Sequence, residues 1–175
     1  MEELVVLVDE HNNVLGTMPK VAVHTTDTPL HRGFSLFVFN SKGELLITQR
    51  ALTKKTFPGV WSNTVCGHPG PSELPKDAAV RRLKEELNMN LQSVEPVTDY
   101  RYRFSDKNGI IENEICPVFW GMSNDVPQVN PLEIEDMKWI PWEDFLNDIQ
   151  VNPDIYSPWC REEAVYVVKS FHITT

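Results

Sequence analysis

The segment SNTVCGHPGPSELPKDAAVRRLKEELNM, residues 62–89, decides the fold of this chain. It opens with a short run suited to a strand, passes through Gly67 into a loop rich in glycine and proline, and then becomes helical in pattern. Pro75 suits the first turn of a helix. An apolar stripe follows it, made of Ala79, Val80, Leu83 and Leu87. The segment therefore predicts a strand, a glycine turn and a helix that ends near Leu87.

Charged residues recur at fixed intervals along this loop and helix. They are Glu73, Arg81, Arg82, Glu85 and Glu86. Side chains four residues apart share a helix face, so Arg82 can pair with Glu86. A solvated helix held by salt bridges accounts for the pattern without any function. Clustered carboxylates after a glycine turn also suit a divalent cation, although the charges alone favour the first explanation.

Apolar alternation outside this segment predicts a mixed sheet. Strands are expected at residues 4–9, 14–18, 34–40, 45–50, 62–66, 100–104, 110–120 and 136–140. Helices are expected at residues 142–149 and from 157 to about 169. We find no repeat and no linker, so residues 1–175 are expected to form one domain. Its class is α+β, arranged as an α/β/α sandwich.

Composition limits the classes of function. The chain has 175 residues, of which 41% are hydrophobic, and a formal net charge of −9. Neither nucleic acid nor an anionic membrane surface suits such an acidic chain, because both need concentrated basic residues. No apolar run approaches the roughly 20 residues of a membrane span, and the first residues lack the basic start of a signal peptide. We therefore expect a cytoplasmic protein whose partner is a small molecule.

Cys66 stands among imidazole and carboxylate residues. The group comprises His24, His31, His68, Glu112 and Glu114. Glu112 and Glu114 are two residues apart, so both would point to one face of a strand. Imidazole with carboxylate suits Zn²⁺, Mn²⁺ or Mg²⁺, and five ligands exceed the four of a closed structural zinc site. The other two cysteines, Cys116 and Cys160, are expected to be thiols buried by packing.

The spacing of the first segment resembles the Nudix box, a loop–helix–loop that holds divalent cations against diphosphates. Gly67, Glu73 and Arg81 stand at matching positions of that box. The sequence departs from it twice, with Arg82 in place of a glutamate and Asn88 in place of a glycine. A cation in place of a carboxylate removes a hard oxygen ligand, so Arg82 is expected to contact a phosphate directly.

Five segments resemble the type 1 isopentenyl-diphosphate Δ-isomerases, which have the Nudix fold. They are HTTDTPLHRGFSLFVFN (24–40), QRALTKKTFPGVWSNTVCGHP (49–69), YRYRFSD (100–106), GIIENEICPVF (109–119) and YSPWC (156–160). The likeness runs in order from about Lys20 to Trp159, and those isomerases also have arginine at the position of Arg82. It implies a Nudix-like mixed β-sheet flanked by helices. The implied enzyme isomerises isopentenyl diphosphate to dimethylallyl diphosphate in isoprenoid biosynthesis.

The resemblance also implies a site. Its metal ligands would be His24, His31, His68, Glu112 and Glu114, which together hold one Mn, Zn or Mg ion. Its catalytic residues would be Cys66 and Glu114, with Tyr102 beside that glutamate and Trp159 closing over the substrate. Glu86 would bind a second metal, Mg²⁺, together with the substrate diphosphate. The cations that contact the diphosphate would be Lys20, Arg50, Lys54 and Arg82.

The implied reaction adds a proton at one carbon of an alkene and removes another proton two carbons away. Protonation develops carbocation character, so an acid and a base must flank the substrate and water must be excluded. We expect Glu114, helped by Tyr102, to act as the acid and Cys66 as the base, with the reverse order left open. The face of Trp159 would stabilise the cation. The enzyme is expected to be a monomer, with a dimer as the alternative.

Two other functions fit parts of the sequence. A Nudix hydrolase would cleave nucleoside or other diphosphates, and both Arg82 and Cys66 argue against it. A non-catalytic module would instead use His24, His31, Cys66 and His68 as a closed structural zinc site. Release of phosphate or nucleotide would identify the hydrolase, and loss of metal on removal of Cys66 would identify the zinc module.

Overall fold

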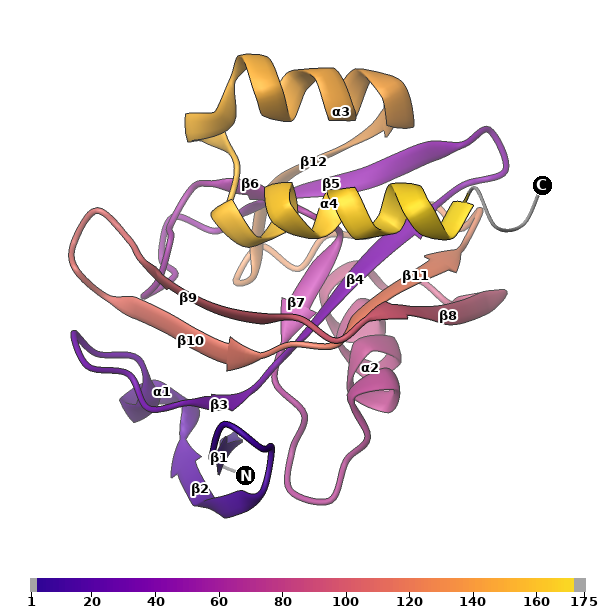
Figure 1. Cartoon of the computed structure of the whole chain (residues 1–175). Helices are drawn as coiled ribbons and strands as arrows, with labels where there is room; N and C mark the ends of the chain where they lie inside the picture. Colours follow the sequence, from indigo (N-terminus) through magenta and orange to yellow (C-terminus); the bar gives the residue numbers. More distant parts are fainter. Residues whose placement is uncertain (1–2, 172–175) are drawn as a thin grey trace.

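Two mixed sheets and the helices around them make up residues 3–171, which the computed structural model describes (Figure 1). The strands are β1 (Leu4–Val8), β2 (Val14–Pro19), β3 (His31–Arg32), β4 (Phe34–Phe39), β5 (Glu44–Arg50), β6 (Trp61–Ser62), β7 (Val65–Gly67), β8 (Ser93–Thr98), β9 (Arg101–Ser105), β10 (Ile111–Ile115), β11 (Val118–Met122) and β12 (Ile134–Pro141). The helices are α1 (Lys20–Val23), α2 (Pro75–Leu87), α3 (Trp142–Val151), the short 3₁₀ helix η1 (Pro153–Ile155) and α4 (Pro158–Phe171). Within residues 3–171, every helix is too short or too polar to cross a membrane.

The strands divide into a smaller and a larger sheet. The smaller sheet has the order β2-β1-β3-β10-β9, and the larger sheet has the order β12-β5-β4-β11-β8. β6 and β7 extend the larger sheet by pairing with β5 and β4. In Figure 1 the sheets meet where β3 continues into β4 and β10 continues into β11.

One pair of chain segments belongs to both sheets. β3 runs parallel to β10, with His31 opposite Glu114, and β4 then runs parallel to β11. Between them, the Gly33 N–H donates to a carbonyl of the opposite segment at 2.9 Å, and the Ser35 N–H donates to the Pro117 carbonyl at 3.0 Å. The parallel pairing therefore continues across the junction, and it fixes His31 beside Glu114.

The structure corrects several strand predictions. The single strand predicted at 110–120 is wrong, because the chain divides there into β10 and β11 at Pro117, which has no N–H for a ladder. The strand predicted at 62–66 likewise divides into β6 and β7, whereas the strand at 34–40 is confirmed as β4. α1 and β8 were not predicted. α1 has only four residues, and β8 is an edge strand that contains Pro96.

The helix in the deciding segment is confirmed as α2, from Pro75 to Leu87. One member of its predicted apolar stripe is wrong, because Val80 is 39% exposed. It directly follows a buried alanine, and successive helical residues point in directions about 100° apart. Asn88 ends the helix in the left-handed conformation, with φ of 52°. Asparagine tolerates this conformation and so takes the place of the glycine that the box usually has.

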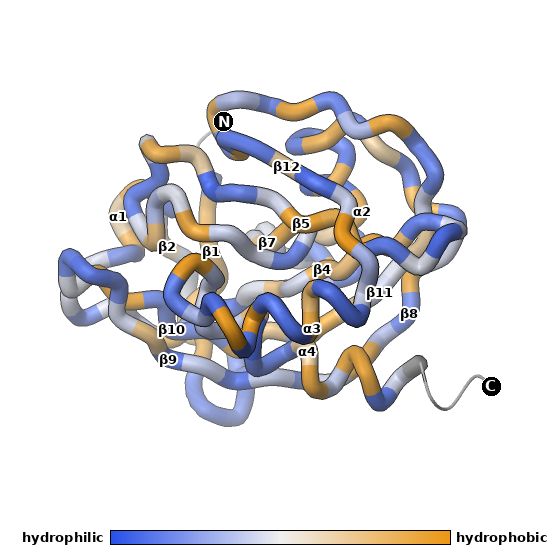
Figure 2. The backbone as a smooth tube through the Cα atoms, turned by 90° about the horizontal axis from the view of Figure 1, so that it is seen from above, coloured by the Kyte–Doolittle hydropathy of each residue, from blue (hydrophilic) through white to orange (hydrophobic). Residues whose placement is uncertain are grey.

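Helices cover both faces of the larger sheet, so the predicted α/β/α sandwich is confirmed. α2 packs on one face, where Leu83 joins Leu36 in a buried cluster. α3 and α4 pack on the other face, where Phe145 and Trp159 join Phe37 in a second cluster. Figure 1 shows these two helices on the same side of the sheet. In Figure 2 hydrophobic and hydrophilic residues alternate along both, as expected for helices with one buried face.

Gly33 lets the junction between the sheets accommodate Glu114. A Cβ at Gly33 would lie 1.8 Å from Glu114 Oε2. We predict that Gly33→Ala displaces this carboxylate, destabilises the fold by about 1–3 kcal/mol, as overpacking usually does, and weakens Mn²⁺ binding. Gly70→Ala is the matched control, because a Cβ there meets its nearest neighbour at 3.5 Å. Urea unfolding and Mn²⁺ titration measure both effects, and equal behaviour of the two variants would contradict the prediction.

Candidate active site

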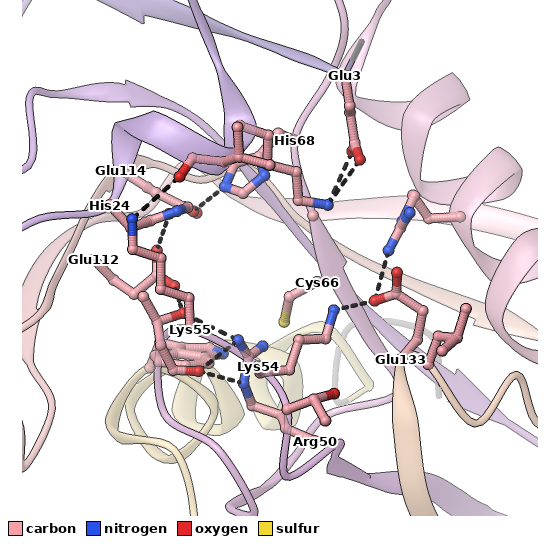
Figure 3. Close-up of a pocket in the computed structure, with 18 of the residues that line it drawn as sticks. Glu3, His24, Arg50, Lys54, Lys55, Cys66, His68, Glu112, Glu114 and Glu133 are labelled. Atoms are coloured by element: carbon pink, nitrogen blue, oxygen red, sulfur yellow. Dashed lines mark hydrogen bonds and ion pairs between the residues drawn. The ribbon is translucent and has the colours of Figure 1, made fainter. Parts of the chain in front are cut away.

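A cavity of about 420 Å³ lies beside the junction of the two sheets (Figure 3). Most of the residues predicted for the site line it: Lys20, His24, Arg50, Lys54, Cys66, His68, Arg82, Tyr102, Glu112, Glu114 and Trp159. Two predicted residues, His31 and Glu86, are not among the lining residues. His31 is fully buried beside Glu114, and Glu86 is paired with Arg82. The fold thus gathers the predicted site from distant parts of the sequence.

Five predicted metal ligands form one buried group. His31 comes from β3, Glu112 and Glu114 come from β10, His24 follows α1, and His68 follows β7. One ligand atom of each lies within 4.8 Å of the others. Opposite ligands of a six-coordinate ion such as Mg²⁺ are about 4 Å apart. The spacing of the group therefore fits one ion at its centre.

Several atoms of this group lack hydrogen-bond partners. His24 Nε2, His31 Nε2 and Glu112 Oε2 are buried without one, although the first and last of these atoms approach each other to 2.9 Å. The other ends of two residues are engaged. His31 Nδ1 lies 2.9 Å from the Pro29 carbonyl, and Glu112 Oε1 accepts from the Thr56 hydroxyl. A proton on Nδ1 leaves the Nε2 lone pair for a metal, so the donor set fits a divalent cation.

The electrostatics of the group also suit a metal, which binds neutral imidazole and ionised carboxylate. Burial lowers the pKa of His68 to about 4. Burial opposes ionisation of Glu114, but the imidazoles of His31 and His68 outweigh it and lower the pKa of that carboxyl. His24 likewise overcomes burial and lowers the pKa of Glu112. Burial disfavours protonated His31, but Glu114 raises its pKa, so a proton and a metal compete for this residue.

Glu114 also borders an aromatic wall. The Tyr102 O–H donates to Glu114 Oε2 at 2.9 Å. The Tyr102 ring stacks on Trp159, with centroids 5.7 Å apart and planes inclined by 19°. Phe57 meets Trp159 edge-on at 5.0 Å. Tyr102 therefore lies beside the glutamate, where the resemblance placed it, and Trp159 extends that wall along the cavity.

Cys66 lies between the metal group and the cationic side of the cavity (Figure 3). Its S–H donates to Asn63 Oδ1 at 3.1 Å, and its sulfur lies 3.6 Å from the Ser35 hydroxyl. Burial, with Glu163 nearby, raises the pKa of this thiol to about 12. The group of metal-ligand atoms does not include Cys66. The closed zinc site that the third hypothesis requires is therefore not the arrangement found among residues 3–171.

The cations predicted to contact a diphosphate all line the cavity, but they already have partners. The Lys20 ammonium lies 2.9 Å from Glu3, and the Lys54 ammonium pairs with Glu133. Arg50 donates to carbonyl oxygens of the loop that follows it, including that of Thr56 at 2.9 Å. These pairings hold the cations at the cavity wall.

Arg82 holds carboxylates of its own helix. Its Nη2 and Nε donate to Glu86 Oε1 at 2.7 and 3.0 Å, and its Nη1 donates to Glu85 at 3.3 Å. Glu86 is 6% exposed, and burial raises its pKa. Its role as a ligand of a second metal stays a prediction.

Sequence reasoning missed a buried carboxyl behind Cys66. Glu163 in α4 is fully buried, and the Ser35 hydroxyl donates to its Oε1 at 2.9 Å. Its Oε2 has no hydrogen-bond partner, and burial raises the pKa of this carboxyl well above its usual value. Cys116 and Cys160 are buried nearby, as expected of packing thiols. The sequence could have indicated this burial, because Glu163 lies on the same helix face as Cys160 and Val167, which are both apolar.

Comparisons with known proteins agree on one fold. A NUDIX domain model matches residues 29–160. A protein of Escherichia coli named isopentenyl-diphosphate Delta-isomerase is 47% identical over 93% of this chain and 90% of that protein. A protein of the same name from Corynebacterium efficiens is 48% identical over 93% of this chain and 88% of its own.

Solved structures give the same result. A protein of Deinococcus radiodurans is 25% identical, with a TM-score of 0.73 over 93% of this chain and 97% of that one. A MutT protein of Methanosarcina mazei is 18% identical, with a TM-score of 0.68 over 81% of this chain and 95% of that one. The second likeness concerns the fold alone.

Glu163 makes stability depend on pH. In the unfolded chain the pKa of Glu163 is near 4, and in the folded chain burial raises it. The free energy of unfolding therefore falls as pH rises from the unfolded pKa to the folded pKa. We predict that Glu163→Gln is more stable than the parent at neutral pH. The difference should grow by up to about 1.4 kcal/mol per pH unit. Urea unfolding from pH 5 to pH 8 measures it, with Glu162→Gln as an exposed control, and a difference that shrinks with pH would refute the account.

Proposed function

Because the chain belongs to the Nudix family and, within it, to the isopentenyl-diphosphate Δ-isomerases, we propose that it converts isopentenyl diphosphate into dimethylallyl diphosphate. One observation carries this proposal. A thiol, Cys66, and a carboxylate, Glu114, line one cavity together with a set of cations. The product is a building block of isoprenoids, so the enzyme serves isoprenoid biosynthesis.

The cavity offers both kinds of wall that this substrate needs. N–H donors for the diphosphate come from Lys20, Arg50, Lys54 and Arg82. Charge-assisted hydrogen bonds of this kind are short and strong. The five-carbon chain would lie against Trp159 and Tyr102, whose stacked rings form an apolar surface beside Glu114.

Two proton transfers on opposite sides of the double bond complete the reaction, and they leave the number of protons unchanged. The two side chains that exchange these protons are Cys66 Sγ and a Glu114 carboxylate oxygen. Tyr102 holds Glu114 by its O–H and fixes the direction of the carboxylate. Each such transfer typically contributes a factor of about 10²–10⁴ to the rate. The expected order, with Glu114 as acid and Cys66 as base, stays a prediction.

The carbocation that develops must be stabilised and kept dry. Trp159 is 1% exposed and lines the cavity. The face of an indole stabilises a desolvated cation by about 2 kcal/mol or more. Phe57 and Tyr102 pack against this ring and hold it in place. An apolar wall suits this step, because water that reached the cation would add to it.

We assign the metals to two places. The group of His24, His31, His68, Glu112 and Glu114 would hold one Mn²⁺, Zn²⁺ or Mg²⁺ ion, and Glu86 would take part in binding Mg²⁺ carried by the diphosphate. A bound ion supplies positive charge and Lewis acidity. The chain itself prepares the first place, because the contact of His31 with the Pro29 carbonyl orients its ring.

Cell location and oligomeric state stay predictions. The acidic net charge of −9 supports a small-molecule partner rather than nucleic acid or an anionic membrane. We propose a cytoplasmic monomer, with a dimer as the alternative.

A proton NMR time course with isopentenyl diphosphate in D₂O tests the function. The isomerase should produce dimethylallyl diphosphate that carries deuterium, because the added proton exchanges with solvent. Prior treatment with a chelator should stop the reaction, and Mg²⁺ with Mn²⁺ or Zn²⁺ should restore it. Release of phosphate from nucleoside diphosphate derivatives, with no isomerisation, would establish the hydrolase instead.

The role of Cys66 is tested by Cys66→Ala. This variant should fold and bind metal normally, because Cys66 is not among the grouped ligand atoms, while turnover falls by about 10²–10⁴-fold. Cys116→Ala is the matched control, since it removes a thiol that does not line the cavity and should keep most of the turnover. Metal content and turnover are measured for both. Loss of metal from Cys66→Ala would support the zinc module.

A further inference from the structure

Four carboxylates of the chain already neutralise three cations of the cavity. Glu3 pairs with Lys20, Glu85 and Glu86 pair with Arg82, and Glu133 pairs with both Lys54 and Arg82. The substrate diphosphate is expected to contact these same cations. It must therefore compete with carboxylates that belong to the chain.

Glu133 differs from the other three carboxylates in position. It lines the cavity and bridges two cations, with its carboxylate 3.2 Å from Arg82 Nη2 and in contact with the Lys54 ammonium (Figure 3). Neither Glu85 nor Glu86 lines the cavity, and Glu3 is 43% exposed and holds only Lys20. Glu133 therefore occupies the place where an anionic group would meet two cations at once.

Leaving Lys54 without a carboxylate would be costly, whereas Arg82 would keep Glu85 and Glu86. The side chains of Lys54 and Arg82 are only 22% and 7% exposed. A buried charge without a partner destabilises a protein by several kcal/mol, whereas a paired one does not. Glu133 supplies this counter-charge, and burial of Glu133 is itself outweighed by Lys54, which lowers the pKa of this carboxyl.

Only the side chain of Glu133 needs to move when an anion arrives. Its backbone N–H donates to the Asn130 carbonyl, and its carbonyl accepts from the Ala51 N–H, each at 3.0 Å. The first of these bonds forms a turn within the segment before β12, and the second holds that segment against the end of β5. Rotation of the side chain can expose both cations without a shift of the sheet.

We propose that Glu133 is an internal substitute for the substrate's diphosphate, which holds Lys54 and Arg82 in place and is displaced when the diphosphate binds. This role rests on the proposed function, because it takes the cavity to be the diphosphate site. It also favours multiply charged ligands. A neutral alcohol would leave Glu133 in place, whereas a diphosphate supplies more negative charge than the carboxylate it replaces.

Binding of inorganic diphosphate tests the proposal without turnover. Calorimetric titrations compare the parent with Glu133→Gln, in which the shape is kept and the charge is lost. The dissociation constant should fall about three- to tenfold in Glu133→Gln, since the competing ion pairs no longer have to be broken. Glu135→Gln is the matched control, because it removes an exposed carboxylate two residues away and should leave binding unchanged.

Turnover adds a second measurement. Glu133→Gln should lower the KM for isopentenyl diphosphate by a similar factor without raising kcat, because the interaction is broken on binding rather than in the chemical step. Glu133→Asp keeps the charge on a shorter side chain and should lie between the parent and Glu133→Gln. Circular dichroism confirms that each variant is folded.

The outcomes separate the proposal from its rivals. Unchanged or weaker diphosphate binding by folded Glu133→Gln overturns it. Weaker binding that appears only with Mg²⁺ would show that Glu133 helps to hold the metal, which also overturns it. If diphosphate binds more tightly to Glu133→Gln but the parent does not turn over isopentenyl diphosphate, the proposal that Glu133 is displaced is supported and the proposed reaction is refuted.

Discussion

The pairing of His31 with Glu114 is the contact on which the rest of the site depends. It belongs to a parallel ladder that runs from one sheet into the other, so the position of each residue is set by backbone hydrogen bonds rather than by a loop. Tyr102 pairs with Glu114 from the opposite side through β9. Three neighbouring strands therefore deliver three polar side chains to one place. Sites held on strands in this way keep their geometry more closely than sites on loops.

This arrangement concentrates ionisable groups in a part of the molecule with little water. The pKa of each group shifts in the direction that its neighbours dictate. Carboxylates next to imidazoles stay charged, whereas burial drives Glu163 towards its neutral form, because the uncharged Ser35 hydroxyl that donates to it compensates only in part. Two carboxyl groups of the same core thus differ in charge because their partners differ. Burying these ionisable groups makes the fold less stable than a purely apolar core would be. Functional sites commonly carry this cost in stability.

The sequence was most informative where local pattern and local structure coincide. The helix of the deciding segment begins and ends where its proline and its last leucine predict, and Cys66, His68, Glu112 and Glu114 do converge. What the sequence could not supply was the change of sheet at Gly33 and Pro117, since periodicity does not reveal which partner a strand will have. Glu133 escaped notice for a similar reason. Its partners are 79 and 51 positions away, at Lys54 and Arg82, and no local spacing connects them.

Helix α4 follows every other described element, yet it carries Trp159 and Glu163, which complete the wall and the floor around Cys66. Synthesis proceeds from the N-terminus, so a growing chain exposes the unfinished pocket until this helix leaves the ribosome. Both sheets can pair before then, because none of their strands lies in α4. The pocket is therefore complete only when this helix has docked on the larger sheet. Truncation within that helix would therefore remove part of a core cluster together with one wall of the pocket.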